Sequence, residues 1–240
     1  MMFGHIDSLK AKLDEYRPLT QGELERLRKE FLINFTYNSN AIEGNTLTLR
    51  ETALVLEGLT IDKKPIRDHL EVIGHSDAFR YVEQLVTDNI PLSERIIKEI
   101  HSLVLINRPF DRGKYRNIPV RIMGAYHEPP QPYLVPKLME ELCSKQSDLH
   151  VIEQATLFHL DFEGIHPFID GNGRTGRLIM NLSLMQNGYP PINVKFTDRT
   201  LYYRAFDSYY EHDDHNPMLE LVSGYVEEEL KKLINILDSE

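Results

Sequence analysis

The sequence predicts an all-α fold with a single β-hairpin, and three observations support this prediction. Apolar residues recur at helical spacing through most of the 240 residues. Thr20 and Thr48 are each followed three residues later by glutamate, which is the capping-box pattern of a helix N-terminus. Alternation typical of strands is confined to residues 118–130. We expect a single domain over residues 1–240, because no repeat, linker or low-complexity tract interrupts this pattern.

Several helices are expected in the first third of the chain. The apolar spacing predicts one over residues 6–16 and a second from the Thr20 cap to about residue 42, where Gly44 ends it. A short third helix follows the Thr48 cap. A long fourth helix covers residues 65–87, with apolar side chains along one side.

The strand-like region is the exception to the helical pattern. Within residues 118–130, Val120 and Ile122 alternate with the polar Arg121, and Gly124 offers a tight turn. A lone hairpin is marginal unless it packs on helices. We therefore expect either a surface β-ribbon or a flap whose free edge pairs with an extended segment of another protein.

The remaining helices surround a glycine-rich loop. Residues 166–177 read His-Pro-Phe-Ile-Asp-Gly-Asn-Gly-Arg-Thr-Gly-Arg. An apolar run from Leu178 to Met185 follows, so a buried helix is predicted to begin near Gly171, and loop and helix together span residues 166–187. Other helices are expected from Ser93 to about residue 107, over 134–147 and 151–162, after Asp198, which is expected to cap its helix, and over 219–237.

The loop and the start of its helix bring together groups that bind phosphate. A helix N-terminus presents unpaired N–H groups and the positive end of the helix dipole, so it favours an anion such as an oligophosphate. Arg174 and Arg177 are three residues apart and are expected to reach the same anion. Each residue also has an ordinary interpretation: Asp170 as an N-cap, His166 as a structural histidine, and the arginines as surface charges.

A dinucleotide-binding loop is a competing interpretation, because Gly171, Gly173 and Gly176 form G-x-G-x-x-G. That fingerprint requires a preceding strand within a βαβ unit. Here Gly164 and Pro167 interrupt the residues before it, and no alternation of strands and helices follows. The Rossmann interpretation is therefore rejected.

Composition and charge restrict the expected partners. A net charge of −10 argues against general affinity for nucleic acid or membranes. No apolar stretch approaches the roughly 18 residues of a membrane helix, and the first residues lack the segments of a signal peptide. The single cysteine, Cys143, forms no internal disulfide, which is typical of a reducing compartment. We expect a cytoplasmic protein.

The loop resembles the signature of the Fic family, H-P-F-x-[D/E]-G-N-G-R-x-x-R, and residues 166–177 meet every fixed position. The resemblance spans most of the chain. It implies a Fic-type helical domain that transfers AMP from ATP to a Ser, Thr or Tyr hydroxyl of a target protein or of itself. It implies His166 as general base and Asp170 as the ligand of Mg²⁺ (or Mn²⁺). The residues that it assigns to the nucleotide are Gly124, Ala125, Tyr126, His127, Asp170, Gly171, Asn172, Gly173, Arg174, Thr175, Gly176, Arg177, Tyr202, Tyr203 and Tyr210.

The resemblance also assigns roles within this site. Asn172 and the backbone amides of the turn would hold the phosphates, and Arg174 and Arg177 would bind the outer ones. The flap, at about residues 118–130, would dock the target protein. The flap residues concerned are Val120, Arg121, Ile122 and Met123.

A second motif implies an inhibitory helix at about residues 20–43. Glu43 lies at its C-terminal end, where the helix dipole disfavours a carboxylate, and by itself it reads as an exposed glutamate that tolerates a small penalty. Ser39 to Gly44 also reads S-x-x-x-E-G, which resembles the family's inhibitory motif [S/T]-x-x-x-E-[G/N]. The resemblance implies that Glu43 pairs with Arg177 and blocks the productive pose of ATP, with Ser39 one turn earlier on the same face.

Other classes of function stay open from the sequence. One is a non-catalytic module that senses a nucleotide or binds a partner. Another is a Fic variant that transfers a different phosphate-containing group or removes AMP. Gly173 disfavours a kinase-like variant, because the kinase-like relatives have lysine at that position. A homo-oligomer is among the partners that the sequence leaves open.

Overall fold

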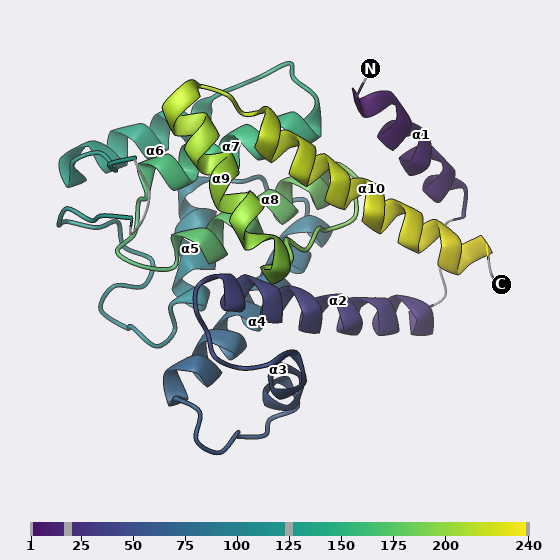
Figure 1. Ribbon diagram of the computed structural model, residues 1–240, viewed down its shortest axis with the longest axis horizontal. Helices are drawn as coiled ribbons and strands as arrows, with labels where there is room; N and C mark the ends of the chain where they lie inside the picture. The colour runs from purple at the N-terminus through teal and green to yellow at the C-terminus, as the bar shows by residue number, and fades with distance from the viewer. Residues whose placement is uncertain (1, 17–20, 123–126, 239–240) are drawn as a thin grey trace.

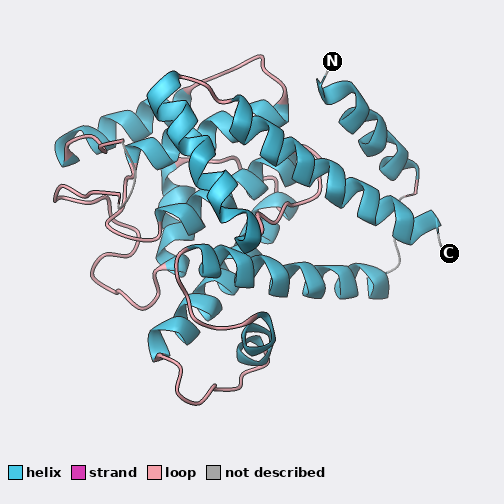
Figure 2. Ribbon diagram, viewed as in Figure 1, coloured by secondary structure: helices cyan, strands magenta, loops and turns pink. Residues whose placement is uncertain are grey.

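The structure is a computed structural model that describes residues 2–16, 21–122 and 127–238, so the predicted Thr20 cap lies outside it. Within these residues the chain is helical, and no helix of this part is long and apolar enough to cross a membrane (Figures 1 and 2). The helices are α1 (Met2–Glu15), α2 (Gln21–Ile42), α3 (Leu49–Leu56), α4 (Ile66–Thr87), α5 (Glu94–Val104), η1 (Pro132–Leu134), α6 (Val135–Ser144), α7 (Val151–Ile165), α8 (Asn172–Gln186), η2 (Phe196–Asp198), α9 (Arg199–His212) and α10 (Asn216–Asp238).

Side chains cap the starts of α3 and α5, whereas the predicted Asp198 cap of α9 does not form. The Thr48 hydroxyl accepts a hydrogen bond from Glu51 N, and the Glu51 carboxylate accepts one from Thr48 N, which completes the predicted capping box. The Ser93 hydroxyl caps α5 with one hydrogen bond, which it accepts from Ile96 N. Asp198 precedes α9 but does not cap it, because its carboxylate accepts a hydrogen bond of 2.5 Å from the Tyr225 hydroxyl instead.

Helix α8 belongs to both of the main hydrophobic cores of the described residues, and it lies near the centre of the molecule (Figure 1). Met180 and Leu184 pack with side chains of α1, α7, α9 and α10. Leu178 and Leu182 pack with side chains of α2, α4, α5 and α6. All residues from 174 to 182 are buried, which confirms the predicted buried helix. The N-terminus of α8 is therefore held firmly from two sides.

Helix α2 ends in a Schellman motif. The N–H of Gly44 donates to the carbonyl of Ala41, and the N–H of Asn45 donates to the carbonyl of Asn40. Gly44 has φ of +91°, a conformation that residues with a Cβ rarely adopt. The predicted stop at Gly44 is thus confirmed. The turn leaves Glu43 at the end of α2, facing α8.

The structure does not show the predicted hairpin. Residues 118–122 and 127–130 form no strand in the described part of the chain. The expected alternation of side chains is present, since Val120 and Ile122 are half-buried and Arg121 is exposed. The turn falls outside the described residues, and with it the predicted site residues Met123, Gly124, Ala125 and Tyr126.

A buried arginine and three prolines account for the irregular backbone of the two arms. The Arg116 guanidinium donates to the carbonyls of Ile118 in one arm and Pro130 in the other, and to the carbonyl of His166. Pro119, Pro129 and Pro130 have no N–H for a cross-strand ladder. The guanidinium thus supplies donors that a partner strand would otherwise supply, and it ties both arms to the end of α7.

Candidate active site

A cavity of about 500 Å³ lies at the N-terminus of α8. The end of α2, the end of α7, the glycine-rich loop and one side of α9 form its walls. A cavity of this volume accommodates a nucleotide-sized ligand. The lining residues are Glu43, Ile122, Glu163, His166, Ile169, Asp170, Gly171, Asn172, Gly173, Arg177, Tyr202, Tyr203, Phe206, Asp207 and Tyr210.

His166 ends α7 in a left-handed conformation, with φ of 48° and ψ of 59°. Residues with a Cβ rarely adopt this conformation, and here it turns the chain from α7 into the loop. Burial lowers the pKa of His166 to about 4, an effect that the neighbouring carbonyl of Glu163 partly opposes. The imidazole is therefore neutral at physiological pH, and one of its two ring nitrogens carries no proton.

Asp170 and Asn172 shape the loop. The Asp170 carboxylate accepts a hydrogen bond of 2.7 Å from the next backbone N–H and lies 3.4 Å from guanidinium nitrogens of Arg108 and Arg174. The Asn172 side chain bonds both peptide groups of Phe168 at 2.9 Å. The Asn172 amide thus fixes the loop, and the backbone amides of the helix N-terminus are left for an anion.

The Asp170 side chain fits a role as a single metal ligand. No three His, Cys, Asp or Glu side chains of the described residues are grouped to hold a metal ion. Mg²⁺ in nucleotide sites is commonly held by one or two carboxylates together with the phosphates, so such a cage is not required. Asp170 lines the cavity with 45% of its side chain exposed, and this donor suits that arrangement.

Arg177 is held by the end of α2, as the second motif implies. Its guanidinium is 1% exposed and donates to the Glu43 carboxylate at 2.8 Å. It also donates to the hydroxyl of Ser39 at 3.0 Å and to the carbonyl of Ser39 at 2.8 Å. A Cβ added to Gly173 would lie 2.3 Å from Oε1 of Glu43, so this carboxylate rests against the first turn of α8. It therefore lies at the place where an anion would approach the helix.

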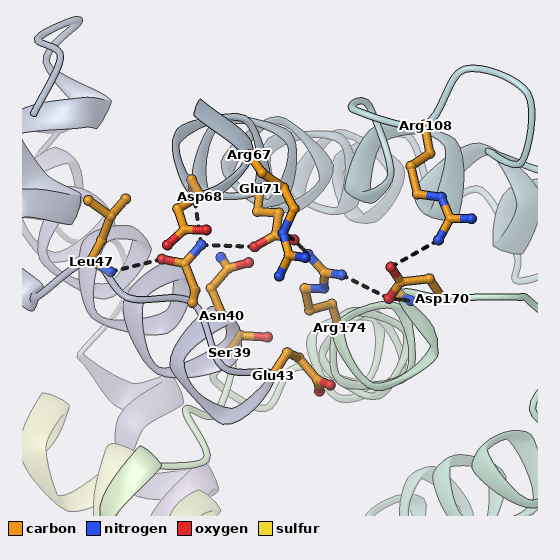
Figure 3. A network of polar contacts seen from close by, with 12 residues as sticks. Ser39, Asn40, Glu43, Leu47, Arg67, Asp68, Glu71, Arg108, Asp170 and Arg174 are labelled. Carbon is orange, nitrogen blue, oxygen red and sulfur yellow. Dashed lines mark hydrogen bonds and ion pairs between the residues drawn. The ribbon is translucent and has the colours of Figure 1, made fainter. Parts of the chain in front are cut away.

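Arg174 is not among the residues that line the cavity, and the expectation that both arginines reach one anion stays a prediction. It is 2% exposed and lies between Glu71 of α4, at 3.6 Å, and Asp170, at 3.4 Å (Figure 3). Glu71 also pairs with Arg67 at 3.2 Å. Residues three apart in a helix differ by about 60° around its axis. This difference turns Arg174 toward α4 and leaves Arg177 facing the cavity.

Tyrosines of α9 line the cavity, as the resemblance implies. Tyr202 is buried and accepts a hydrogen bond from Arg177, whereas Tyr203 is 46% exposed. Tyr210 stacks on His127 with ring centroids 4.2 Å apart. His127 is not among the residues that line the cavity. Its Nε2 lies 2.8 Å from the carbonyl of Gly164 in α7.

Other predicted residues lie outside the cavity wall. Thr175 is fully buried within α8, and Gly176 packs against His159 and Glu163. Ser39 contacts Arg177 through its hydroxyl and its carbonyl. Of the described flap residues Ile122 lines the cavity, whereas Val120 and Arg121 do not.

Sequence reasoning missed Glu163, which lies one turn before His166 on α7. It is 9% exposed, and its Oε2 lies 3.8 Å from Nδ1 of His166. Burial raises the pKa of Glu163 to about 8; Glu43 adds to this effect and Arg177 opposes it. The signal in the sequence was a single carboxylate within the otherwise apolar stretch 162–165, three residues before the histidine. Ile169, Phe206 and Asp207 also line the cavity without a distinguishing sequence signal.

Comparison with known proteins gives the family of this arrangement. Residues 91–184 match the Fic/DOC family. The chain is 37% identical over 232 residues to Protein adenylyltransferase Fic of Nematostella vectensis, which covers 92% of this chain and 54% of that protein. It is 36% identical over 207 residues to the protein of the same name from Drosophila melanogaster, covering 82% and 42%. The chain thus spans about half the length of the curated relatives it matches.

Solved structures agree over nearly the whole chain. Fic-1 from C. elegans superposes with a TM-score of 0.86 at 30% identity, covering 98% of this chain and 71% of that one. A Fic domain containing signaling protein from Bacteroides thetaiotaomicron superposes with a TM-score of 0.89 at 28% identity, covering 98% and 97%. Fold and site define a helical domain that presents a histidine beside the N-terminus of a buried helix. The chain belongs to the Fic/DOC family.

Proposed function

We propose that this chain is a protein adenylyltransferase that transfers AMP from ATP to a Ser, Thr or Tyr hydroxyl of a target protein, or of itself. One observation carries the proposal: a neutral His166 and the N-terminus of α8 line the same cavity. A base therefore lies beside a place suited to phosphate. The names of the relatives from Nematostella and Drosophila support the same activity.

The phosphates of ATP bind at the start of α8, where the backbone N–H groups and the helix dipole favour negative charge. Arg177 binds the outer phosphates once it is released from Glu43, because a guanidinium forms strong charged hydrogen bonds with phosphate. Tyr203 and Tyr210 form the opposite wall, against the adenosine. Asp170 would hold Mg²⁺, which supplies positive charge to the phosphates when it is bound.

His166 removes the proton of the target hydroxyl as the hydroxyl oxygen attacks the α-phosphorus of ATP. A bond forms between that oxygen and the α-phosphorus, and the bond from the α-phosphorus to the bridging oxygen breaks in line. Pyrophosphate leaves with the electron pair, and Arg177 and the start of α8 stabilise its charge. The products are the AMP ester of the target and a protonated His166.

Autoinhibition by Glu43 is the second part of the proposal. The Glu43 carboxylate holds Arg177 and rests against the first turn of α8, so it competes with the outer phosphate for both positive groups. ATP then binds in a pose that is unproductive. The target segment would dock along residues 118–122, which reach the cavity at Ile122.

Labelling with ATP that carries ³²P at the α or the γ position tests the activity. The protein and its Glu43→Gly variant are incubated with cell lysate, and mass spectrometry identifies the modified residue. We expect label from the α position alone, stronger in the variant and absent from Glu43→Gly combined with His166→Ala. Transfer of γ label would indicate a kinase-like variant. ATP binding without transfer from either position would indicate a nucleotide sensor.

A further inference from the structure

A buried group of polar side chains lies behind His166, and the proposed reaction does not use it. His159 Nε2 lies 2.6 Å from the Tyr202 hydroxyl. His159 Nδ1 and Glu163 Oε1 face the same point on α8, since a Cβ added to Gly176 would lie 2.7 Å from the first and 2.8 Å from the second. These side chains extend from Arg177, which donates to Tyr202 at 3.4 Å, toward the end of α7. They connect the Glu43–Arg177 ion pair with the surroundings of His166.

Three polar atoms of this group have no hydrogen-bond partner among the described residues. They are Nδ1 of His159, Oε1 of Glu163 and Nδ1 of His166. The other carboxylate oxygen of Glu163 lies 3.8 Å from this Nδ1, about 1 Å beyond a hydrogen bond. A side-chain movement of about 1 Å is therefore enough to pair the two groups.

We propose that Glu163 is the positioning residue of His166: its carboxylate accepts a hydrogen bond from Nδ1–H and so leaves Nε2 as the free base. This inference rests on the proposed function, because it assigns the orientation of that base. A neutral imidazole carries one N–H, and the nitrogen without it must face the target hydroxyl. After the proton transfer, the carboxylate lies beside the positive imidazolium and stabilises it.

The protonation state of Glu163 decides which tautomer forms. A protonated Glu163 donates to Nδ1, which moves the ring proton to Nε2 and blocks the base. An ionised Glu163 accepts from Nδ1–H and raises the basicity of a ring whose pKa burial has lowered to about 4. Glu163 must therefore lose its proton before transfer.

Titratable groups on four elements surround Glu163. His159 lies on α7 and His166 at its C-terminal end, Glu43 at the end of α2, Arg177 on α8, and Tyr202, Tyr203 and Tyr210 on α9. Burial and then Glu43 raise the pKa of Glu163 to about 8, and Arg177 lowers it. Glu43 consequently acts on the site in a second way, since its negative charge favours the protonated form of Glu163.

The tautomer of His166 can be measured directly, without any activity. Histidine-selective ¹⁵N labelling and long-range ¹H–¹⁵N spectra of the nucleotide-free protein are recorded from pH 6 to 10, and the His166→Ala variant identifies the His166 signals. We expect a switch from the Nε2–H to the Nδ1–H form as the pH rises through about 8. The midpoint moves to lower pH in Glu43→Gln. The switch is lost in Glu163→Gln and unchanged in Glu153→Gln, a matched substitution on the same helix.

A second variant guards against a loss of folding. If Glu163→Gln fails to fold, Glu163→Asp replaces it in the test. The shorter side chain keeps the carboxylate but moves it away from the His166 ring, so we expect the switch to be lost again. An unchanged switch in either folded variant overturns the inference. So does a single tautomer from pH 6 to 10 in the unmodified protein, which would mean that the backbone carbonyl of Glu163 holds Nδ1–H.

Activity gives an independent measurement in the Glu43→Gly background. We expect kcat/KM for AMP transfer to rise with pH as Glu163 ionises, and this rise to disappear in Glu43→Gly combined with Glu163→Gln. In this double variant the rate above pH 8 falls at least tenfold relative to Glu43→Gly. This fall is smaller than the roughly 10²–10⁴-fold that loss of a general base costs. The KM for ATP stays the same. A tautomer switch without AMP transfer from any variant supports the positioning and overturns the proposed function. Transfer that is unaffected by Glu163→Gln overturns the positioning.

Discussion

Nη2 of Arg177 donates a hydrogen bond of 2.8 Å to Oε1 of Glu43, across 134 positions of the chain. The two ends of this ion pair differ in burial, since the arginine side chain is 1% exposed and the glutamate side chain is 34% exposed. The carboxylate can therefore leave the pair and enter water, whereas the guanidinium stays buried and needs a new acceptor. An incoming phosphate is such an acceptor.

Replacement of Glu43 by glycine should activate the protein. A charged hydrogen bond contributes about 1.5–3 kcal/mol, and if it must break before transfer, its loss increases the rate roughly 10- to 150-fold.

Arg177→Glu should not activate, because the phosphate then loses its partner too. Ser39→Ala should activate less than Glu43→Gly, since the Ser39 carbonyl and Glu43 still hold the guanidinium. Incorporation of α-labelled AMP measures all three, with melting temperatures as the folding control. Equal labelling by the unmodified protein and Glu43→Gly would contradict autoinhibition.

His166→Ala should abolish transfer and leave ATP binding nearly intact. The imidazole acts on the target hydroxyl, whereas the phosphates bind at the start of α8. Loss of a general base lowers the rate by ~10²–10⁴-fold. Calorimetric titration with ATP and the labelling assay, both in the Glu43→Gly background, separate the two effects. Normal turnover would remove His166 from the mechanism.

Proline at position 120 tests the flap as a docking edge. Val120 is half-buried and does not line the cavity, so Val120→Pro removes a backbone donor without touching the nucleotide. Modification of the target should fall far more than ATP affinity. Ile122→Pro is a less clean variant, because Ile122 lines the cavity. A parallel loss of ATP affinity in Val120→Pro would indicate that the segment is structural.

Gly176→Ala should destabilise the fold through Glu163. The added Cβ would lie 2.8 Å from Oε1 of Glu163 and 2.7 Å from Nδ1 of His159, both closer than a Cβ tolerates. Overpacking of this kind costs about 1–3 kcal/mol. Shortening the glutamate makes room, so Gly176→Ala combined with Glu163→Ala should lose less stability than the sum of the single changes. Denaturant unfolding of the four proteins measures the coupling, and strict additivity would show that the two sites do not touch.

The stability of the protein should depend on pH through Glu163. In the unfolded chain the carboxyl ionises near its ordinary pKa of 4.5, whereas burial raises the pKa in the fold to about 8. Between these values the unfolded state has released the proton and the native state retains it, so the free energy of unfolding falls as the pH rises from about 4.5 to 8. The Glu163→Gln variant lacks this carboxyl, so its free energy of unfolding does not fall with pH in this way. The melting temperature of the variant relative to the unmodified protein should rise from pH 5 to 8 and then level off; a constant difference would contradict a buried, protonated glutamate.

The sequence predicted the helices well because their signals are local. The Thr48 box, the stop at Gly44 and the apolar run after residue 177 each involve neighbouring residues, and the structure confirms all three. Asp198 was misread as a cap, since its true partner is Tyr225 on another helix. The fate of a polar side chain depends on such distant partners.

The same distinction between local signals and distant partners explains which parts of the candidate site could be predicted. The signature placed His166 and the helix N-terminus correctly in one cavity. It did not indicate that Arg174 turns to Glu71, because Glu71 is more than a hundred positions away in the chain. Glu163 was missed because burial, which no local pattern reports, is what distinguishes it from a surface glutamate.

The shared burial of α8 determines which parts of this domain can change without loss of the fold. Because both cores pack on that helix, its amide hydrogens should be among the last to exchange with solvent, and a change in its side chains disturbs the whole domain. Substitutions that alter activity while preserving the fold are therefore expected at the end of α2 and in the flap. The N-terminus of α8, where we propose that phosphate binds, should therefore stay constant, and differences between related proteins should accumulate in the segments that approach it.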